Sequence, residues 1–193
     1  RFDLTGVVSN CDGVWRHNNH NLAFSPDGQH GYLVFNGDWV EDGTQDYVFE
    51  PIMYKTDDGG DTWTGPIHID LKDYSQVIDN ITTLFTDPQN PGTVVDTSTR
   101  LPGASIGDLT VDADGNPHYF LRIFNQAEIQ NPIQECDSSL SFIQPAAAKP
   151  LFDFTSIDQG ETFCPKLIGF SNTFQGSIDG TDVSFGNALQ TGR

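Results

Sequence analysis

Two eight-residue segments of this chain share one pattern, and this repeat constrains the fold more than any other feature. Residues 56–63 read Thr-Asp-Asp-Gly-Gly-Asp-Thr-Trp, and residues 156–163 read Ser-Ile-Asp-Gln-Gly-Glu-Thr-Phe. Both fit the pattern Ser/Thr-x-Asp-x-Gly-x-Thr-aromatic, at an offset of 100 residues. A short pattern that recurs at such a distance indicates a supersecondary unit that occurs at least twice.

The residue types of this pattern predict a tight β-hairpin. Asp58 and Asp158 are suited to accept hydrogen bonds from backbone N–H groups of the loop. Gly60 and Gly160 allow a positive φ. The flanking hydroxyl and aromatic residues are expected to brace the turn; they are Thr56, Thr62, Trp63, Ser156, Thr162 and Phe163. We interpret all these residues as structural rather than catalytic.

A second repeat lies upstream of each hairpin. Residues 22–28 and 32–34 match residues 109–115 and 119–121 at an offset of 87, and both copies contain an Asp-Gly turn. Because the hairpins are offset by 100, the second copy is expected to carry 13 extra residues between its second and third strands. The predicted strands are Asn21–Ser25, Gly31–Asn36, Tyr47–Lys55 and Ile67–Leu71, then Asp108–Asp112, His118–Phe124, Leu151–Thr155 and Lys166–Phe170, with loops at Gly37–Gln45 and Asn125–Pro150.

A recurring four-stranded antiparallel unit that cannot bury its faces alone is typical of a β-propeller blade. We therefore predict an all-β fold made of such blades. One blade spans residues 20–71, a connector spans 72–106, a second blade spans 107–170, and residues 171–193 begin a further blade. Since a propeller needs at least about four blades, we expect the chain to be an incomplete part of a larger propeller.

The hairpin pattern resembles the Asp-box, or BNR repeat, of sialidases, sortilin-type receptors and xyloglucan-cleaving glycosidases. In those families the Asp-box joins the third and fourth strands of a blade, the place predicted here for residues 56–63 and 156–163. The sequence of the first predicted blade, together with the Asn-rich and acidic composition, also resembles large secreted surface proteins of Bacteroidota. The motif is structural in all these families, so the resemblance implies a fold and no particular activity.

An enzymatic function finds little support in the sequence. Sialidases bind a substrate carboxylate with three arginines, one of them in an Arg-Ile-Pro element, and the nearest match here is Arg122-Ile123-Phe124 inside a predicted strand. A glycosidase needs two carboxylates in defined positions. The chain has 27 Asp and Glu residues, and the sequence does not identify a catalytic pair among them. We expect a non-catalytic scaffold or a protein- or glycan-binding module. Part of an Asp-box glycoside hydrolase and a sortilin-like peptide receptor are the alternatives.

One rim of the predicted propeller gathers candidate binding residues. In an up-and-down blade, the loop before the first strand and the loop between the second and third strands share one end, opposite the hairpins. Trp39, in a polar loop, is the best candidate for an exposed recognition aromatic; packing against a neighbouring blade is the competing interpretation. The two histidines are interpreted as capping groups rather than metal ligands. The predicted rim consists of His17, His20, Asp38, Trp39, Glu41 and Asp42, with the enlarged loop 125–150.

Charge and hydropathy limit the partners. The formal net charge is −18, from 27 acidic and 9 basic residues, and such a surface repels nucleic acid and anionic membranes. No segment approaches the roughly 18 apolar residues of a membrane span. We expect protein or glycan partners, no nucleic acid and no membrane insertion. The composition favours a secreted or cell-surface protein, and the ends at Arg1 and Arg193 indicate a mature product or a piece of a larger chain or assembly.

The cysteines and the acidic turns leave alternatives open. Three cysteines allow one internal disulfide: a bond between Cys136 and Cys164 is one interpretation, free thiols are the other, and Cys11 has no obvious mate. No metal or cofactor is predicted. Calcium is an alternative carried by charge density alone, because the spacing is not that of an EF-hand; the acidic residues concerned are Asp57, Asp58, Asp61, Asp112 and Asp114.

Overall fold

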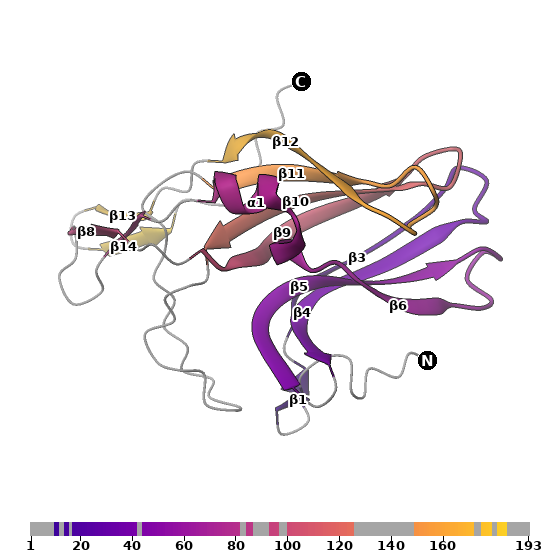
Figure 1. Cartoon of the computed structure of the whole chain (residues 1–193), viewed down its shortest axis with the longest axis horizontal. Helices are drawn as coiled ribbons and strands as arrows, with labels where there is room; N and C mark the ends of the chain where they lie inside the picture. The colour runs from indigo at the N-terminus through magenta and orange to yellow at the C-terminus, as the bar shows by residue number, and fades with distance from the viewer. Residues whose placement is uncertain are drawn as a thin grey trace.

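Two four-stranded antiparallel sheets dominate the computed structural model (Figure 1). The first has the order β3 (His17–Phe24), β4 (Gly31–Glu41), β5 (Thr44–Thr56) and β6 (Thr64–His68), and the second has β9 (Pro102–Val111), β10 (Pro117–Asn125), β11 (Lys149–Thr155) and β12 (Cys164–Ser171). The predicted all-β class is confirmed. The structure describes residues 10–11, 14–15, 17–41, 44–81, 84–86, 93–96, 100–125, 149–171, 175–178 and 181–184.

Three short strand pairs and one helical segment complete the described elements. The pairs are β1 (Asn10–Cys11) with β2 (Val14–Trp15), β7 (Leu84–Thr86) with β8 (Val94–Asp96), and β13 (Gln175–Ile178) with β14 (Thr181–Ser184), and the helical turns are η1 (Leu71–Asp73) and α1 (Ser75–Asn80). Of the helices in the described part of the chain, none has the length and apolar character that crossing a membrane requires. Within 171–193, the described residues beyond β12 form the pair β13–β14.

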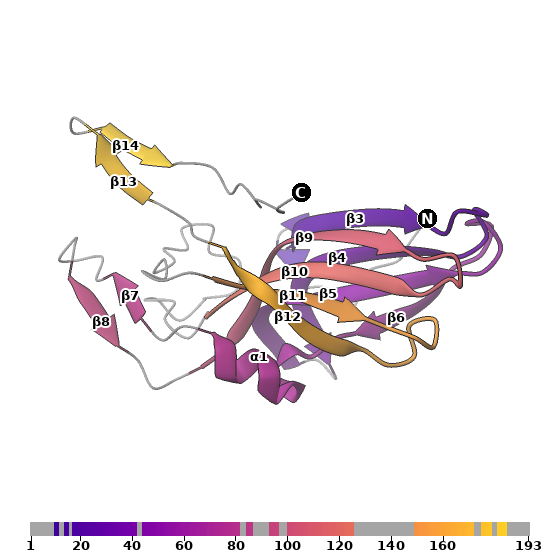
Figure 2. The same cartoon turned by 90° about the horizontal axis from the view of Figure 1, so that it is seen from above.

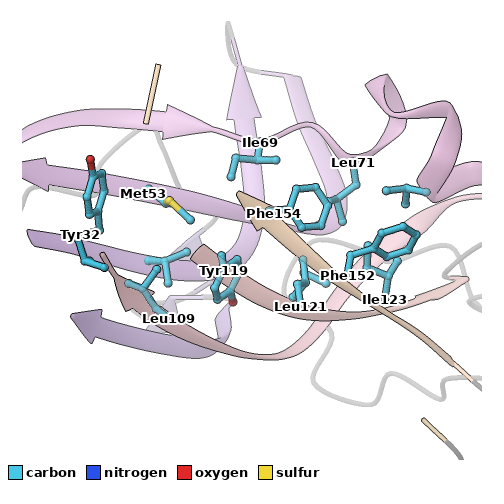
Figure 3. Close-up of a cluster of buried hydrophobic side chains, with 14 of the residues drawn as sticks. Tyr32, Met53, Ile69, Leu71, Leu109, Tyr119, Leu121, Ile123, Phe152 and Phe154 are labelled. Carbon is cyan, nitrogen blue, oxygen red and sulfur yellow. The ribbon is translucent and has the colours of Figure 1, made fainter. Parts of the chain in front are cut away.

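The two sheets lie face to face around one hydrophobic core (Figure 3). Strand β9 of the second sheet lies against β3, β4 and β5 of the first. Alternate residues of a strand point to opposite faces, so each sheet has one face in this core. We call the core-facing side of the first sheet its front and that of the second sheet its back. Its fully buried residues include Tyr32, Val34 and Met53 on the front of the first sheet, and Tyr119, Leu121, Phe152 and Phe154 on the back of the second.

The turn between the first two strands is one residue longer in the first sheet than in the second. Phe24 pairs with Gly31, whereas Val111 pairs with Pro117. The shorter turn in the second sheet shifts all later residues by one position relative to the first. A shift of one residue moves every side chain to the opposite face.

This shift corrects the sequence alignment of residues 32–34 with 119–121. Leu33 pairs with Tyr54, and Tyr119 pairs with Phe154. Tyr119 is therefore the equivalent of Leu33 and not of Tyr32. The two tyrosines lie on opposite faces of their sheets, and both point into the same core.

The enlarged loop is also one residue longer than predicted. Gly31 pairs with Thr56, 25 residues later, and the equivalent contact joins Pro117 O to Ser156 N, 39 residues later. The second copy therefore carries 14 extra residues here instead of 13. Residues 126–148 of this loop lie outside the described residues.

The connector between the two sheets packs into the core. The fourth strand β6 spans Thr64–His68 and so lies three residues before the predicted Ile67–Leu71, whose last residue already begins η1. The Tyr74 ring meets Phe154 edge-on, with centroids 5.6 Å apart, and α1 contacts β12. The connector therefore buries apolar side chains in the core, which a simple turn would not do. The buried residues between the end of β6 and the end of α1 and its cap are Ile69, Leu71, Val77 and Ile81.

Two predicted irregular segments are strands. β4 and β5 run through the predicted loop Gly37–Gln45, because β4 ends at Glu41 and β5 begins at Thr44. Aromatic and β-branched residues favour strands. In this segment Trp39 and the neighbouring residues of these types favour a strand more strongly than the polar residues oppose it. Similarly, β9 begins at Pro102, inside the segment predicted as connector.

Candidate functional site

The same four hydrogen bonds close each repeated hairpin. Thr56 Oγ1 donates to Asp58 Oδ1 at 2.8 Å and accepts from Gly60 N at 2.9 Å. The backbone N and the Oγ1 of Thr62 donate to the two carboxylate oxygens of Asp58, at 2.8 and 2.6 Å. The corresponding distances in the second hairpin are 2.7, 2.8, 2.9 and 2.6 Å, with Ser156, Gly160 and Thr162 around Asp158.

These bonds hold both hairpin carboxylates in the ionised form. The pKa of Asp58 and that of Asp158 fall to about 2, chiefly because the hydroxyl of Thr62 or of Thr162 donates to the carboxylate. A general acid needs a pKa near the working pH, so neither group suits proton transfer. The carboxylates of Asp58 and Asp158 instead close the turns of the two hairpins.

The hairpins and the Asp-Gly turns form one end of both sheets, and they bond to each other. Gly59 N donates to Gln29 O at 2.9 Å, and Gln159 N donates to Asn116 Oδ1 at 3.1 Å. Figure 2 shows the turns of the two sheets gathered at this end. The opposite end of the first sheet, where β4 turns into β5, holds the predicted rim.

The predicted rim residues that the structure describes lie on strands and not in loops. The side chain of His20 is exposed and that of Trp39 is partly buried; the other rim side chains lie outside the described residues. The strand positions are His17 and His20 on β3, and Asp38, Trp39 and Glu41 on β4, while Asp42 is not among the described residues.

Trp39 is part of a cluster on the back of its own sheet. Its indole ring stacks on the imidazole of His68 from β6, with centroids 4.2 Å apart and planes 9° apart. His68 Nε2 lies 2.7 Å from Oε2 of Glu50, which belongs to β5. The sequence predicted either an exposed Trp39 or packing against a neighbouring blade. Instead, the ring is partly buried against the apolar pair Ile52 and Tyr54 of the same sheet.

Glu50 is the buried carboxyl group of this cluster. Its side chain is fully buried, and this burial raises its pKa, against the opposing effect of the hydrogen bond with His68. Lys72 Nζ lies 4.0 Å from Glu50 Oε1 and 3.8 Å from Asp70 Oδ2. These five residues, Trp39, Glu50, His68, Asp70 and Lys72, are called the Glu50 cluster below.

Two polar atoms of the Glu50 cluster are buried without a hydrogen-bond partner. They are Glu50 Oε1 and Trp39 Nε1, two of only four such side-chain atoms in the described part of the chain. Buried polar atoms are nearly always bonded in native proteins, and each exception needs an explanation. The cluster is therefore the candidate functional site.

Sequence reasoning did not single out Glu50 or His68, although the repeat contains a signal for both. Ile52 pairs with His68 and its equivalent Phe152 pairs with Leu167, so Leu167 replaces His68 in the second sheet. Pro150 stands 100 residues after Glu50, at the hairpin offset. Ionisable residues at positions that are apolar in the other copy mark a feature that the repeat itself does not require.

Two further predicted residues, Arg122 and Cys164, lie outside the Glu50 cluster. Arg122, the nearest match to the sialidase arginine element, is buried on β10 and donates to Ser105 Oγ at 2.8 Å. Cys164 is an exposed, free thiol; because Cys136 lies outside the described residues, the pairing of these two cysteines stays a prediction. Among the residues that the structure describes, no three His, Cys, Asp or Glu side chains come together as a metal site.

Comparison with models of known protein families and with curated proteins finds no match to this chain. Its function therefore has to be inferred from its own residues and geometry.

Proposed function

We propose that this chain is a non-catalytic β-propeller segment of a secreted or cell-surface protein, and that it serves as a scaffold or as a module that binds a protein or glycan. Three features support the proposal. The two sheets have the same strand order, they carry hairpins with the same hydrogen bonds, and the back of the second sheet packs on the front of the first. Units that stack in this way bury their faces only against neighbours.

The observation that carries the proposal is an uncovered apolar position on the back of the first sheet. Leu22 pairs with Leu33, and Leu109 pairs with Tyr119 at the equivalent place in the second sheet. Leu109, in the core between the sheets, is 8% exposed, whereas Leu22 is 58% exposed. Burying a leucine side chain contributes about 1.5–3 kcal/mol. We infer that another sheet covers Leu22 in the complete protein.

Chemical labelling of the intact protein tests this inference. The experiment compares Leu22→Cys with Ile157→Cys, a hairpin position that is 87% exposed, after the native cysteines have been replaced by serine. If another sheet covers the back face, a thiol reagent should modify position 22 more slowly than position 157 by about tenfold or more, since thiol reactivity depends on access. Equal rates at the two positions would contradict the scaffold proposal.

A second candidate function, part of an Asp-box glycoside hydrolase, is favoured by Glu50 alone. A carboxyl group whose pKa is raised by burial is the kind that glycosidases use as a general acid. A hydrolysis screen of the intact protein against neutral oligosaccharides separates the two functions. Turnover that is lost in Glu50→Gln and kept in Glu161→Gln, an exposed carboxyl group of the second hairpin, would overturn the non-catalytic proposal.

A further inference from the structure

We propose that another copy of this chain covers the back of the first sheet, and that it does so with the front of its own second sheet. The proposal rests on the propeller scaffold proposed above and names the sheet that covers Leu22. It is carried by the contact between the two sheets of one chain, by the two faces that this contact leaves without a second sheet, and by the polar atoms on those faces.

The contact inside one chain provides the geometry. The front of the first sheet packs on the back of the second, so each sheet has one further face outside this core. Of the two four-stranded sheets that the structure describes, the first has no second sheet on its back and the second has none on its front. A front and a back are the two kinds of face that already pack together in this chain. Repeating the same contact between copies joins them head to tail.

The front of the second sheet has apolar side chains at its surface. Phe120 lies between Tyr119 and Leu121, which both point into the core, so its side chain lies on the front. Because Tyr119 is the equivalent of Leu33, Phe120 stands where the first sheet has Val34. Val34 is fully buried between the sheets, whereas Phe120 is partly exposed. The other apolar residues that are exposed or partly exposed on this front are Ile106 and Leu151.

The buried side-chain atoms that lack a hydrogen-bond partner lie on these two faces. In the described part of the chain they are Glu50 Oε1 and Trp39 Nε1 on the back of the first sheet, and Asp153 Oδ1 and Arg122 Nε on the front of the second. Arg122 and Asp153 alternate with core residues, as Phe120 does, and the guanidinium group of Arg122 is hydrogen-bonded through Nη2. Each face therefore has one such donor and one such acceptor.

The two faces are also matched in charge. The back of the first sheet has the buried carboxyl group of Glu50, and the front of the second has the buried guanidinium group of Arg122. Complementary charges determine which surfaces associate and in which orientation. The net charge of −18 opposes association of copies in general, so a contact between copies requires a match of this kind between specific faces.

Closure determines how many copies associate. Head-to-tail contacts form a closed ring when the rotation between neighbours allows it, and an open filament when it does not. Propellers have about four to eight blades, and each copy supplies two four-stranded sheets. The expected assembly is therefore a ring of two, three or four copies.

The test is sedimentation-velocity centrifugation of the intact chain, with a reducing agent because Cys164 is exposed. Leu22→Asp places a charge on the back of the first sheet, and Phe120→Asp places one on the front of the second. Both positions lie outside the core, so both variants should keep the urea midpoint of the unchanged chain. Loss of a buried apolar contact should weaken association about tenfold or more in each. Ile157→Asp, at a hairpin position that is 87% exposed, is the matched control and should associate as the unchanged chain does.

A mixture of the two variants distinguishes a head-to-tail contact from a symmetric one. Each variant keeps one working face, so the mixture should form a dimer with one copy of each, while neither variant associates alone. A mixture that stays monomeric, or association that Phe120→Asp leaves unchanged, overturns the proposal.

A monomeric unchanged chain also overturns the proposal, and the labelling of position 22 then decides what remains. If a thiol reagent still modifies position 22 slowly in the intact protein, another part of the protein covers the back of the first sheet and the scaffold proposal stands. If positions 22 and 157 react at equal rates, both proposals fail.

Discussion

The contact between Tyr119 and Asn36 offers a direct test of how the two sheets are held together. The Tyr119 hydroxyl donates to Asn36 Oδ1 at 2.9 Å, and both residues are fully buried. Asn36 Nδ2 donates in turn to the backbone O of Ser105 on β9, also at 2.9 Å. One amide of the first sheet therefore bonds to the second sheet through both of its polar atoms.

The perturbation is Tyr119→Phe, which keeps the ring and its packing and removes only the hydroxyl. Asn36 Oδ1 then stays buried without its donor. Leaving a buried acceptor unsatisfied costs about 1–3 kcal/mol of unfolding free energy. For a chain of this length, a loss of 2 kcal/mol corresponds to a fall in melting temperature of about 4–8 °C.

The assay is urea unfolding of the intact protein followed by circular dichroism. The control is Tyr74→Phe, because the Tyr74 ring also packs in the core, against Phe154, while no described residue accepts a hydrogen bond from its hydroxyl. We expect this control to change stability by less than about 0.5 kcal/mol. A double-mutant cycle with Asn36→Leu should give a coupling energy of about 0.5–3 kcal/mol. The reasoning is refuted if Tyr119→Phe is no more costly than Tyr74→Phe.

Two further predictions concern the core and the hairpins. Gly107→Ala should lower stability by about 1–3 kcal/mol, because its Cβ would lie 2.5 Å from the Tyr119 ring, whereas Gly169→Ala meets nothing within 4 Å and should not; equal urea midpoints would contradict this packing. Asp58 and Asp158 have folded pKa values of about 2, below the ordinary 3.8, so their contribution to stability is complete above pH 3.8 and is lost as the pH falls toward 2. The urea midpoint should therefore fall less steeply over this range in a variant with Asn at both positions, and an unchanged slope would argue against these bonds.

The local structure of the hairpins could be predicted because it depends on residues that are close in sequence. Asp58, Gly60 and Thr62 lie within five residues of one another, and their hydrogen bonds need no contact from elsewhere in the chain. Residue type and spacing then suffice, as they do for the alternation that indicates strands.

The faces of the strands could not be predicted in the same way. Tyr32 and Tyr119 look equivalent in the sequence, but the difference of one residue in the preceding turn puts them on opposite faces of their sheets. Turn length determines register, and register determines the face of every later side chain. The alignment of residues 32–34 with 119–121 was therefore off by one residue, which is enough to reverse the face of each side chain.

The candidate site depended still more on the tertiary structure. Trp39 could be chosen as a rim aromatic from the sequence, but its stacking on His68 and the burial of Glu50 require three strands to come together. The sequence by itself determined two hairpins, an acidic chain and a repeated four-stranded unit, because these follow from local residue types. Only the tertiary structure decided which faces of the sheets pack together and which ionisable side chains are buried. Burial depends on contacts between residues that are far apart in the chain.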